Sequence, residues 1–242
     1  MDNKKFLEQS AGDYHDNILK GWEDLYEEKR QRLFHTMSQY HRPGIALEMG
    51  SADGIMTQKL CGEFESLTVV DGSQLFLDQL KEKVVADNIK VDCALFEEYN
   101  SEVKFNNIFM THILEHLDDP ILVLKRSLDW LADDGYVFIA VPNANSLHRY
   151  VGVEMGMLEK RDSLNDQDVL LGHRRVYTPD LLKSHVESAG YKIEKFGGQM
   201  VKPLSNRQIQ DQWSPELISA FFGLSDKLPE LCSEIFIIAS KA

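Results

Sequence analysis

The sequence predicts an α/β protein built around a parallel sheet with helices on both faces. Short apolar runs typical of buried strands alternate along most of the chain with segments whose apolar residues recur at helical spacing. Parallel strands need a long crossover between them, usually a helix, so this alternation favours a parallel sheet. The 242 residues are enough for one such domain with small additions.

The elements follow in order from a helical segment at residues 13–40. The run 41–44, His-Arg-Pro-Gly, breaks that helix because proline lacks an amide proton and glycine is conformationally free. Farther on, Thr178 is a helix cap followed by Pro179 at the first helical position. Helices are expected over 73–86, 120–131 and 178–190, and strands near 45–49, 67–71, 89–95, 107–111, 136–141, 191–196 and 232–239.

Residues 1–242 are expected to form a single domain with three additions to the sheet. Residues 1–42 would form an N-terminal helical cap. Residues 143–177 interrupt the alternation and are rich in Asn, Asp, His and Arg. Because a long insertion in a compact domain is usually a lid or a binding loop, we expect a lid over the binding site there. Residues 197–230 would form a C-terminal insertion that either closes over the same binding site or makes a homodimer contact.

Composition and charge exclude several classes of partner. The net charge of −13 repels nucleic acid backbones and anionic membranes, so neither is an expected partner. No apolar run reaches the roughly 18 residues of a spanning helix and no signal region follows Met1, so a cytoplasmic protein is expected. Cys61, Cys93 and Cys232 are far apart, which favours buried, reduced thiols over a disulfide framework or a zinc site.

A glycine-containing turn after the first strand predicts a cofactor site. Gly50 and Gly54 would bring bare backbone close to a ligand, at the N-terminus of the helix that follows. Asp71 lies 23 residues after Glu48, at the tip of the second strand, where a carboxylate can accept both hydroxyl protons of a ribose. These residues indicate a cofactor that carries a nucleoside.

Three positions argue against a dinucleotide. A dinucleotide fingerprint would place glycines where this chain has Ala52 and Ile55, so a pyrophosphate cradle is poorly supported. Glu48, beside the first glycine, would repel a diphosphate but suits an ammonium group. S-adenosylmethionine carries such an ammonium.

Four motifs, in this order and spacing, carry a resemblance to a known family. They are LEMGSADG at 47–54, VVDGS at 69–73, HILEHLDDP at 112–120 and VPN at 141–143. From about Gly44 to Gly190 the chain resembles the class I S-adenosylmethionine-dependent methyltransferases, in the branch of ubiquinone-type, small-molecule and sugar methyltransferases. The resemblance implies a Rossmann-like seven-stranded sheet and S-adenosylmethionine as cofactor.

The resemblance also implies how the cofactor is held. Glu48 or the backbone near Gly50 would hold the methionine end, Asp71 the ribose, and the residues around Phe96 and Glu97 the adenine. The expected cofactor-binding set is Glu48, Gly50, Ser51, Gly54, Asp71, Gly72, Ser73, Phe96, Glu97 and Thr111. The chain departs from the family pattern at Ala52, where the loop usually has glycine, and at Asp134-Gly135, where Gly-Gly is usual.

His112 is the first candidate for a general base. It follows the strand near 107–111, so its side chain should face the cofactor, and histidine titrates in the range needed to deprotonate an acceptor hydroxyl. The alternative is that His112 only packs or caps the strand. Residues 112–116 also spell H-x-x-E-H, a zinc-peptidase signature, but that reading requires a continuous helix where the pattern predicts a strand and a turn.

A divalent metal is an open alternative to a protein base. Some relatives in this branch place a Glu-His pair and a later histidine around a cation, and Glu115, His116 and His173 match these positions. Such an ion would orient the acceptor hydroxyl and lower its pKa. Those relatives have an acidic ligand where this chain has His112, so the metal stays undecided; otherwise Glu115 and His116 fix the strand-to-helix turn.

The composition of the insertion 143–177 bears on the charge of the acceptor. It gathers basic and aromatic residues within an acidic chain: Asn145, His148, Arg149, Tyr150, Lys160, Arg161, His173, Arg174, Arg175 and Tyr177. Arginine pairs recognise carboxylate or phosphate, so we expect a small-molecule, anionic acceptor, unless these residues form a solvated loop face. The expected reaction is O-methylation of a small polar or phosphorylated metabolite or sugar. Nitrogen as the acceptor atom and an inactive, cofactor-binding regulatory protein are the alternatives.

Overall fold

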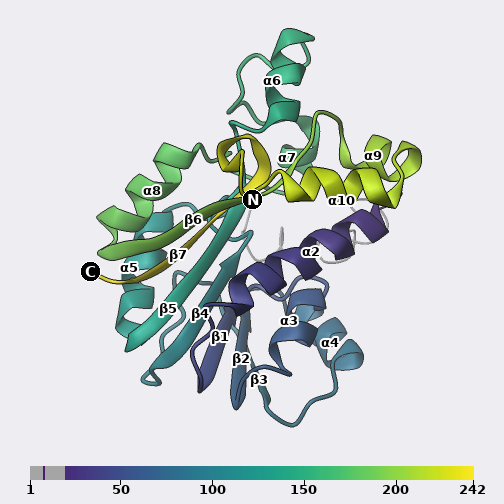
Figure 1. Cartoon of the computed structure of the whole chain (residues 1–242). Coiled ribbons are helices and arrows are strands. Elements are labelled where there is room, and N and C mark those ends of the chain that lie inside the picture. The colour runs from purple at the N-terminus through teal and green to yellow at the C-terminus, as the bar shows by residue number, and fades with distance from the viewer. Residues whose placement is uncertain (1–7, 9–19) are drawn as a thin grey trace.

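The computed structural model describes Glu8 and residues 20–242, and it shows a seven-stranded sheet with helices on both faces (Figure 1). The α/β class and the Rossmann-like sheet expected from the sequence are therefore confirmed. The strands are β1 Ile45–Met49, β2 Ser66–Asp71, β3 Ile89–Cys93, β4 Phe105–Thr111, β5 Leu131–Pro142, β6 Tyr191–Val201 and β7 Cys232–Lys241.

The strand order β3-β2-β1-β4-β5-β7-β6 sets where a ligand can bind. Strands β1 to β5 are parallel to one another, whereas β7 inserts antiparallel between β5 and β6. The chain's path across the sheet reverses between β1 and β4. Ligands of such sheets bind beyond the carboxyl ends of the strands at this reversal.

Two apolar layers hold the helices against the sheet. Along β5, Val137 and Ile139 pack in one cluster with residues of the helices α5 (Pro120–Trp130) and α8 (Pro179–Ser188). The intervening Phe138 and Ala140 pack in another with residues of α2 (Glu23–Ser38), α3 (Ile55–Leu60) and α4 (Gln74–Lys83). All four side chains are fully buried, as expected where alternate residues of a strand face opposite, covered sides of a sheet.

The helices begin where the sequence supplies a cap. Ser73, Asp119 and Thr178 each accept a hydrogen bond from the backbone amide three residues on, which satisfies an otherwise unpaired donor. The helices are α2 Glu23–Ser38, α3 Ile55–Leu60, α4 Gln74–Lys83, α5 Pro120–Trp130, α6 Leu147–Glu154, α7 Asp166–Leu170, α8 Pro179–Ser188, α9 Asn206–Gln212 and α10 Pro215–Gly223, with a 3-10 turn, η2, at Pro229–Leu231. Helix α4 is shorter than expected because Val84 already takes an extended conformation.

The additions to the sheet differ in detail from those expected. Helix α2 forms the described part of the N-terminal cap, and residues 13–19 of the expected helix lie outside the described residues. The segment 143–177 contains the short helices α6 and α7. The boundary at 197 is wrong, because β6 continues to Val201, which pairs with Cys232 of β7. Figure 1 shows α6, α7, α9 and α10 gathered beyond one end of the sheet.

The cysteines and the helices bear on two further expectations. All three cysteines are free thiols, but only Cys232 is buried; Cys61 is half-buried and Cys93 is exposed, which corrects the expectation of three buried thiols. Within the part of the chain that the structure describes, none of the helices has both the length and the apolarity to cross a membrane.

We expect the Leu182→Ala substitution in α8 to lower the free energy of unfolding by about 2–5 kcal/mol, because it leaves a cavity against the sheet. Leu182 is fully buried, whereas its neighbour Leu181 is 36% exposed. Leu181→Ala is therefore the matched control and should change stability by about 0.5 kcal/mol or less. Urea unfolding of both variants measures the difference; equal losses would show that α8 is not packed as described.

Candidate active site

A pocket of about 370 Å³ is lined by residues at the carboxyl ends of β1, β2 and β4. Its volume lies in the range of small-molecule and cofactor sites. Every expected site residue lines this pocket except Gly54 and Ser73. Those two instead form the N-caps of α3 and α4, so they shape the turns that the pocket wall is made of.

The turn after β1 brings backbone against the pocket, as its glycines predict. Gly50 has a φ of 86°, and a Cβ added there would lie 2.3 Å from the Cδ1 atom of Ile113. Ala52, the departure from the family pattern, also takes a positive φ, of 41°. The left-handed turn is therefore kept at position 52 without glycine, at the cost of some backbone strain.

Asp71 is held in a fixed orientation at the end of β2. Its Oδ2 atom accepts hydrogen bonds from the amide of Ser51 at 2.9 Å and the hydroxyl of Ser51 at 3.2 Å. Its Oδ1 atom accepts one from the amide of Ser73 at 2.9 Å. Burial raises the pKa of Asp71, and these hydrogen bonds oppose the rise. The carboxyl group therefore joins the two turns and keeps acceptor capacity toward the pocket.

Glu48 is a buried carboxyl group without a hydrogen bond. It is 1% exposed, and neither oxygen has a partner among the residues that the structure describes. Burial raises the pKa of Glu48 to about 8; the nearby hydroxyl of Thr57 opposes this rise, and the carboxyls of Asp53 and Asp71 add to it. An unpaired carboxyl in a pocket is costly unless a ligand supplies a donor. A cationic donor such as an ammonium group would fit it.

His112, the expected base, has both ring nitrogens engaged. Its Nδ1 atom lies 3.3 Å from Glu115 Oε1, and its Nε2 atom lies 2.8 Å from the Arg30 guanidinium and 3.4 Å from Glu234 Oε2. Its φ is 59°, a conformation that non-glycine residues adopt rarely and that is enriched at functional sites. His112 lies at the expected place, and its role as base stays a prediction.

Glu115, His116 and His173 come together, as the metal alternative requires. One ligand atom from each lies within 4.8 Å of the others. Burial lowers the pKa of His116 to about 4, so its imidazole is neutral. The ring of His173 lies edge-on to that of His116, and its Nδ1 atom lies 2.9 Å from Asp168 Oδ1. A carboxylate bonded to one ring nitrogen is the usual way to aim the other at a metal.

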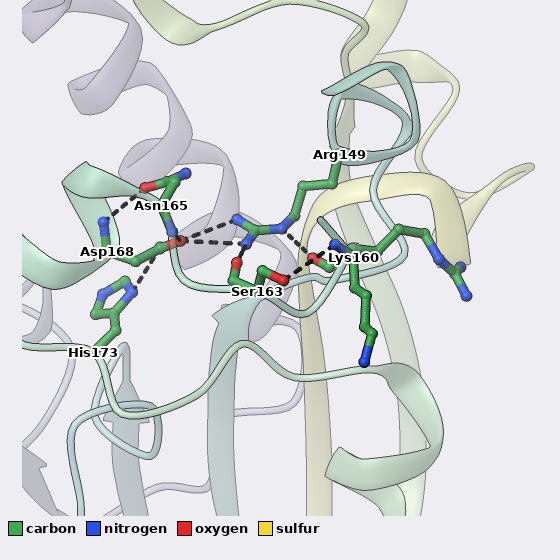
Figure 2. Close-up of polar contacts among 7 residues, drawn as sticks. Arg149, Lys160, Ser163, Asn165, Asp168 and His173 are labelled. Atoms are coloured by element: carbon green, nitrogen blue, oxygen red, sulfur yellow. Dashed lines mark hydrogen bonds and ion pairs between the residues drawn. The ribbon is translucent and has the colours of Figure 1, made fainter. Parts of the chain in front are cut away.

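Figure 2 shows how the insertion holds His173 in place. Arg149 of α6 is buried, and its Nη1 atom lies 3.2 Å from Asp168 Oδ2, while the guanidinium also donates to the carbonyl of Ser163. Asn165 and Asp168 form a capping box at the start of α7. One buried arginine therefore joins α6, the segment after it and the carboxylate that orients His173.

Comparison with known proteins identifies the family. The family model described as a methyltransferase domain matches residues 22–195, most of the chain. The chain belongs to this methyltransferase family. The resemblance to class I S-adenosylmethionine-dependent methyltransferases is thus confirmed.

Two relatives differ in the atom that they methylate. The (S)-coclaurine N-methyltransferase of Papaver somniferum is 27% identical over 139 residues, which cover 55% of this chain and 39% of that protein. The ubiquinone biosynthesis O-methyltransferase of Pelagibacter ubique (strain HTCC1062) is 28% identical over 112 residues, which cover 46% of each. The chain therefore spans less than half the length of these two methyltransferases.

A solved structure shares the fold of this chain. The magnesium protoporphyrin IX methyltransferase of Synechocystis PCC 6803, solved with bound S-adenosylhomocysteine, has a TM-score of 0.66 at 11% identity. The similarity covers 99% of this chain and 98% of that one. The helices that this chain adds around its sheet thus fall within an architecture already seen in a solved methyltransferase.

Several charged residues of the methyltransferase pocket were not among the expected site residues. Glu234 on β7 accepts from the ammonium of Lys29 and lies 3.6 Å from the guanidinium of Arg30, both on α2. Burial alone would raise the pKa of Glu234, but the charges of Lys29, His112 and Arg30 hold it well below the ordinary value. The sequence holds one signal that Lys29 is buried. Lys29 lies four residues from both Leu25 and Leu33, so it falls in the apolar stripe of its helix.

The arginine pair expected to bind an anionic acceptor instead holds the loop after β4. Arg174 forms an ion pair of 2.6 Å with Asp118 and donates to the carbonyl of His116 at 2.9 Å. Arg175 donates to the carbonyl of Leu114 at 3.1 Å. Because these donors satisfy backbone carbonyls, the pair does not support the anionic acceptor inferred from it.

We expect the stability of the wild-type protein to fall as the pH rises, and the Glu48→Gln substitution to abolish this fall. Because its pKa is about 8 in the folded protein against 4.5 ordinarily, folding favours the protonated carboxyl. That contribution is complete below about pH 4.5 and is lost as the pH rises toward 8. Urea unfolding between about pH 5 and pH 8 should show wild-type stability falling relative to Glu48→Gln. The exposed Glu82→Gln variant is the control; wild-type and Glu48→Gln curves that stay parallel would contradict the assignment.

Proposed function

We propose that this chain transfers a methyl group from S-adenosylmethionine to a small-molecule acceptor. The observation that carries the proposal is the buried, unpartnered carboxyl of Glu48 in the same pocket as Asp71 and the turn at Gly50. The ammonium of the cofactor's methionine end would pair with Glu48, and Asp71 would accept from the ribose hydroxyls. Phe96 and Glu97, which also line the pocket, would contact the adenine.

The pocket residues would act mainly by binding and orientation. Bound S-adenosylmethionine supplies an electrophilic methyl group on its sulfonium. Fixing the acceptor in line with that methyl converts a bimolecular displacement into an intramolecular one. Thr111 and His112 lie at the end of β4 and line the pocket, so they are suited to contact the reacting groups. For a hydroxyl acceptor, His112 would take the proton after its Nε2 atom is released from Arg30.

The acceptor atom is proposed to be oxygen, on a small polar or phosphorylated metabolite or sugar. The relatives do not decide this, because one is named as an N-methyltransferase and another as an O-methyltransferase. A histidine at the end of β4 supports oxygen, because an amine acceptor can attack without a base of this kind. The segment 143–177 would serve as the acceptor lid, since its residues 148, 149 and 173 line the pocket.

We expect Glu48→Gln to weaken binding of S-adenosylhomocysteine by about tenfold or more, because it removes a charge-assisted contact to the ammonium. Binding of 5′-methylthioadenosine, which lacks the amino acid end, should not change in this variant. Asp71→Ala should weaken both ligands. Calorimetric titration of each ligand measures these effects. No binding of S-adenosylhomocysteine to the wild-type protein would overturn the proposed function, and equal weakening of both ligands in Glu48→Gln would overturn the role of Glu48.

A second candidate function is metal-assisted O-methylation through Glu115, His116 and His173. It is favoured by the convergence of their ligand atoms and by the bond from His173 to Asp168. These residues would hold a divalent cation, which polarises an acceptor hydroxyl. Mixed imidazole and carboxylate ligands suit several first-row ions.

We expect the wild-type protein to bind one Mn²⁺ per chain in calorimetric titration, and His173→Ala to lose most of that affinity. The matched control is His35→Ala, because His35 is exposed on α2, outside the pocket lining. Loss of a metal ligand, or of the residue that orients one, typically costs at least about tenfold in affinity. Equal Mn²⁺ binding by the wild type and His173→Ala would remove the metal-assisted candidate and leave the methyl-transfer proposal standing.

A further inference from the structure

Basic side chains from three separate elements line one side of the pocket. Lys29 comes from α2, His148 and Arg149 from α6, and Lys202 from the segment after β6. The residues assigned to the cofactor follow β1, β2 and β3, toward the other edge of the sheet. The basic side chains therefore gather around the part of the pocket that the cofactor assignment leaves over.

Lys202 is the least compensated charge of this group. It is 5% exposed, and its Nζ atom donates to the amide oxygen of Asn206 at 2.6 Å. Among the described residues, no carboxylate lies within ion-pair distance of Lys202. Asp168 is paired with Arg149, and Glu234 is shared by Lys29, Arg30 and His112. A buried ammonium bonded only to a neutral amide is costly.

His148 shows how close these charges are to one another. Burial, together with the charges of Lys202, Arg149 and Lys29, lowers its pKa to about 2. Burial and the charges of Lys29 and Arg149 likewise hold the pKa of Lys202 well below its ordinary value, and the carboxylate of Glu234 only partly opposes them. The Nδ1 atom of His148 is buried and has no partner among the described residues. The positive charges around His148 would therefore favour the binding of an anion at this place.

We propose that Lys202, with Lys29 and His148, forms a subsite for an anionic group, a carboxylate or a phosphate, carried by the methyl acceptor. This inference rests on the proposed function, since it assigns the group to the second substrate. An oxyanion at this place would give the Lys202 ammonium the counter-charge it lacks. It would also offer acceptors to several donors at once. The acceptor would thus be anionic, as the insertion first suggested, but through different residues.

The test is calorimetric titration of inorganic phosphate, and separately of acetate, into the protein saturated with S-adenosylhomocysteine, at constant ionic strength. Saturable binding of at least one of the two anions is expected, and the preferred one identifies phosphate or carboxylate. Lys202→Met should weaken that binding by about tenfold or more, and Lys202→Arg should restore most of it. The exposed Lys195→Met variant, on β6, is the control and should leave binding unchanged.

The outcomes separate this subsite from the proposed function. S-adenosylhomocysteine is titrated into every variant, which also shows that each one folds. If the cofactor product binds but neither anion does, the subsite is overturned and the proposed function stands. If the anions bind only without S-adenosylhomocysteine, they occupy the place of its own carboxylate, and the subsite is again overturned. Equal binding by wild type and Lys202→Met also overturns it.

Discussion

The buried carboxylate of Glu234 is the constraint on which the pocket depends. It lies on β7, directly before the buried apolar run 235–239, and a charge at that place must be paired inside the protein. Lys29 and Arg30 supply the pairing from α2, and His112 adds to it from the end of β4. The N-terminal helix, the antiparallel strand and the candidate base are therefore fixed relative to one another by one side chain.

The sheet could be predicted from the sequence because its signals are local. Apolar runs mark the strands, and caps at Ser73, Asp119 and Thr178 mark the helix starts. The end of β6 could not be read in this way. Its last residues, through Val201, are held by pairing with β7, and that pairing joins segments far apart along the chain. Strand ends that depend on a distant partner leave little trace in local composition.

The same distinction separates the two halves of the pocket. Glu48, Gly50 and Asp71 lie at the carboxyl ends of consecutive strands, at a spacing that the fold fixes, so their meeting could be predicted from the sequence. The basic residues of the pocket come from α2, α6 and the segment after β6. The distances between these segments along the chain do not determine which of their residues meet. Polar residues inside apolar stripes, such as Lys29 and Glu234, were the available clue, because a charge at a buried position requires a partner.

If the insertion serves as the proposed lid, Arg149 would couple substrate enclosure to assembly of the site. Its guanidinium links α6 to Asp168, and Asp168 in turn fixes the ring of His173 beside His116. A displacement of α6 and α7 large enough to admit a ligand would separate Asp168 from His173, because Arg174 and Arg175 hold the chain after His173 to the loop after β4. The open protein would then lack the carboxylate that orients His173, so premature chemistry on water or on a poorly seated molecule would be disfavoured. Selectivity can in this way come from the timing of assembly as well as from the shape of the pocket.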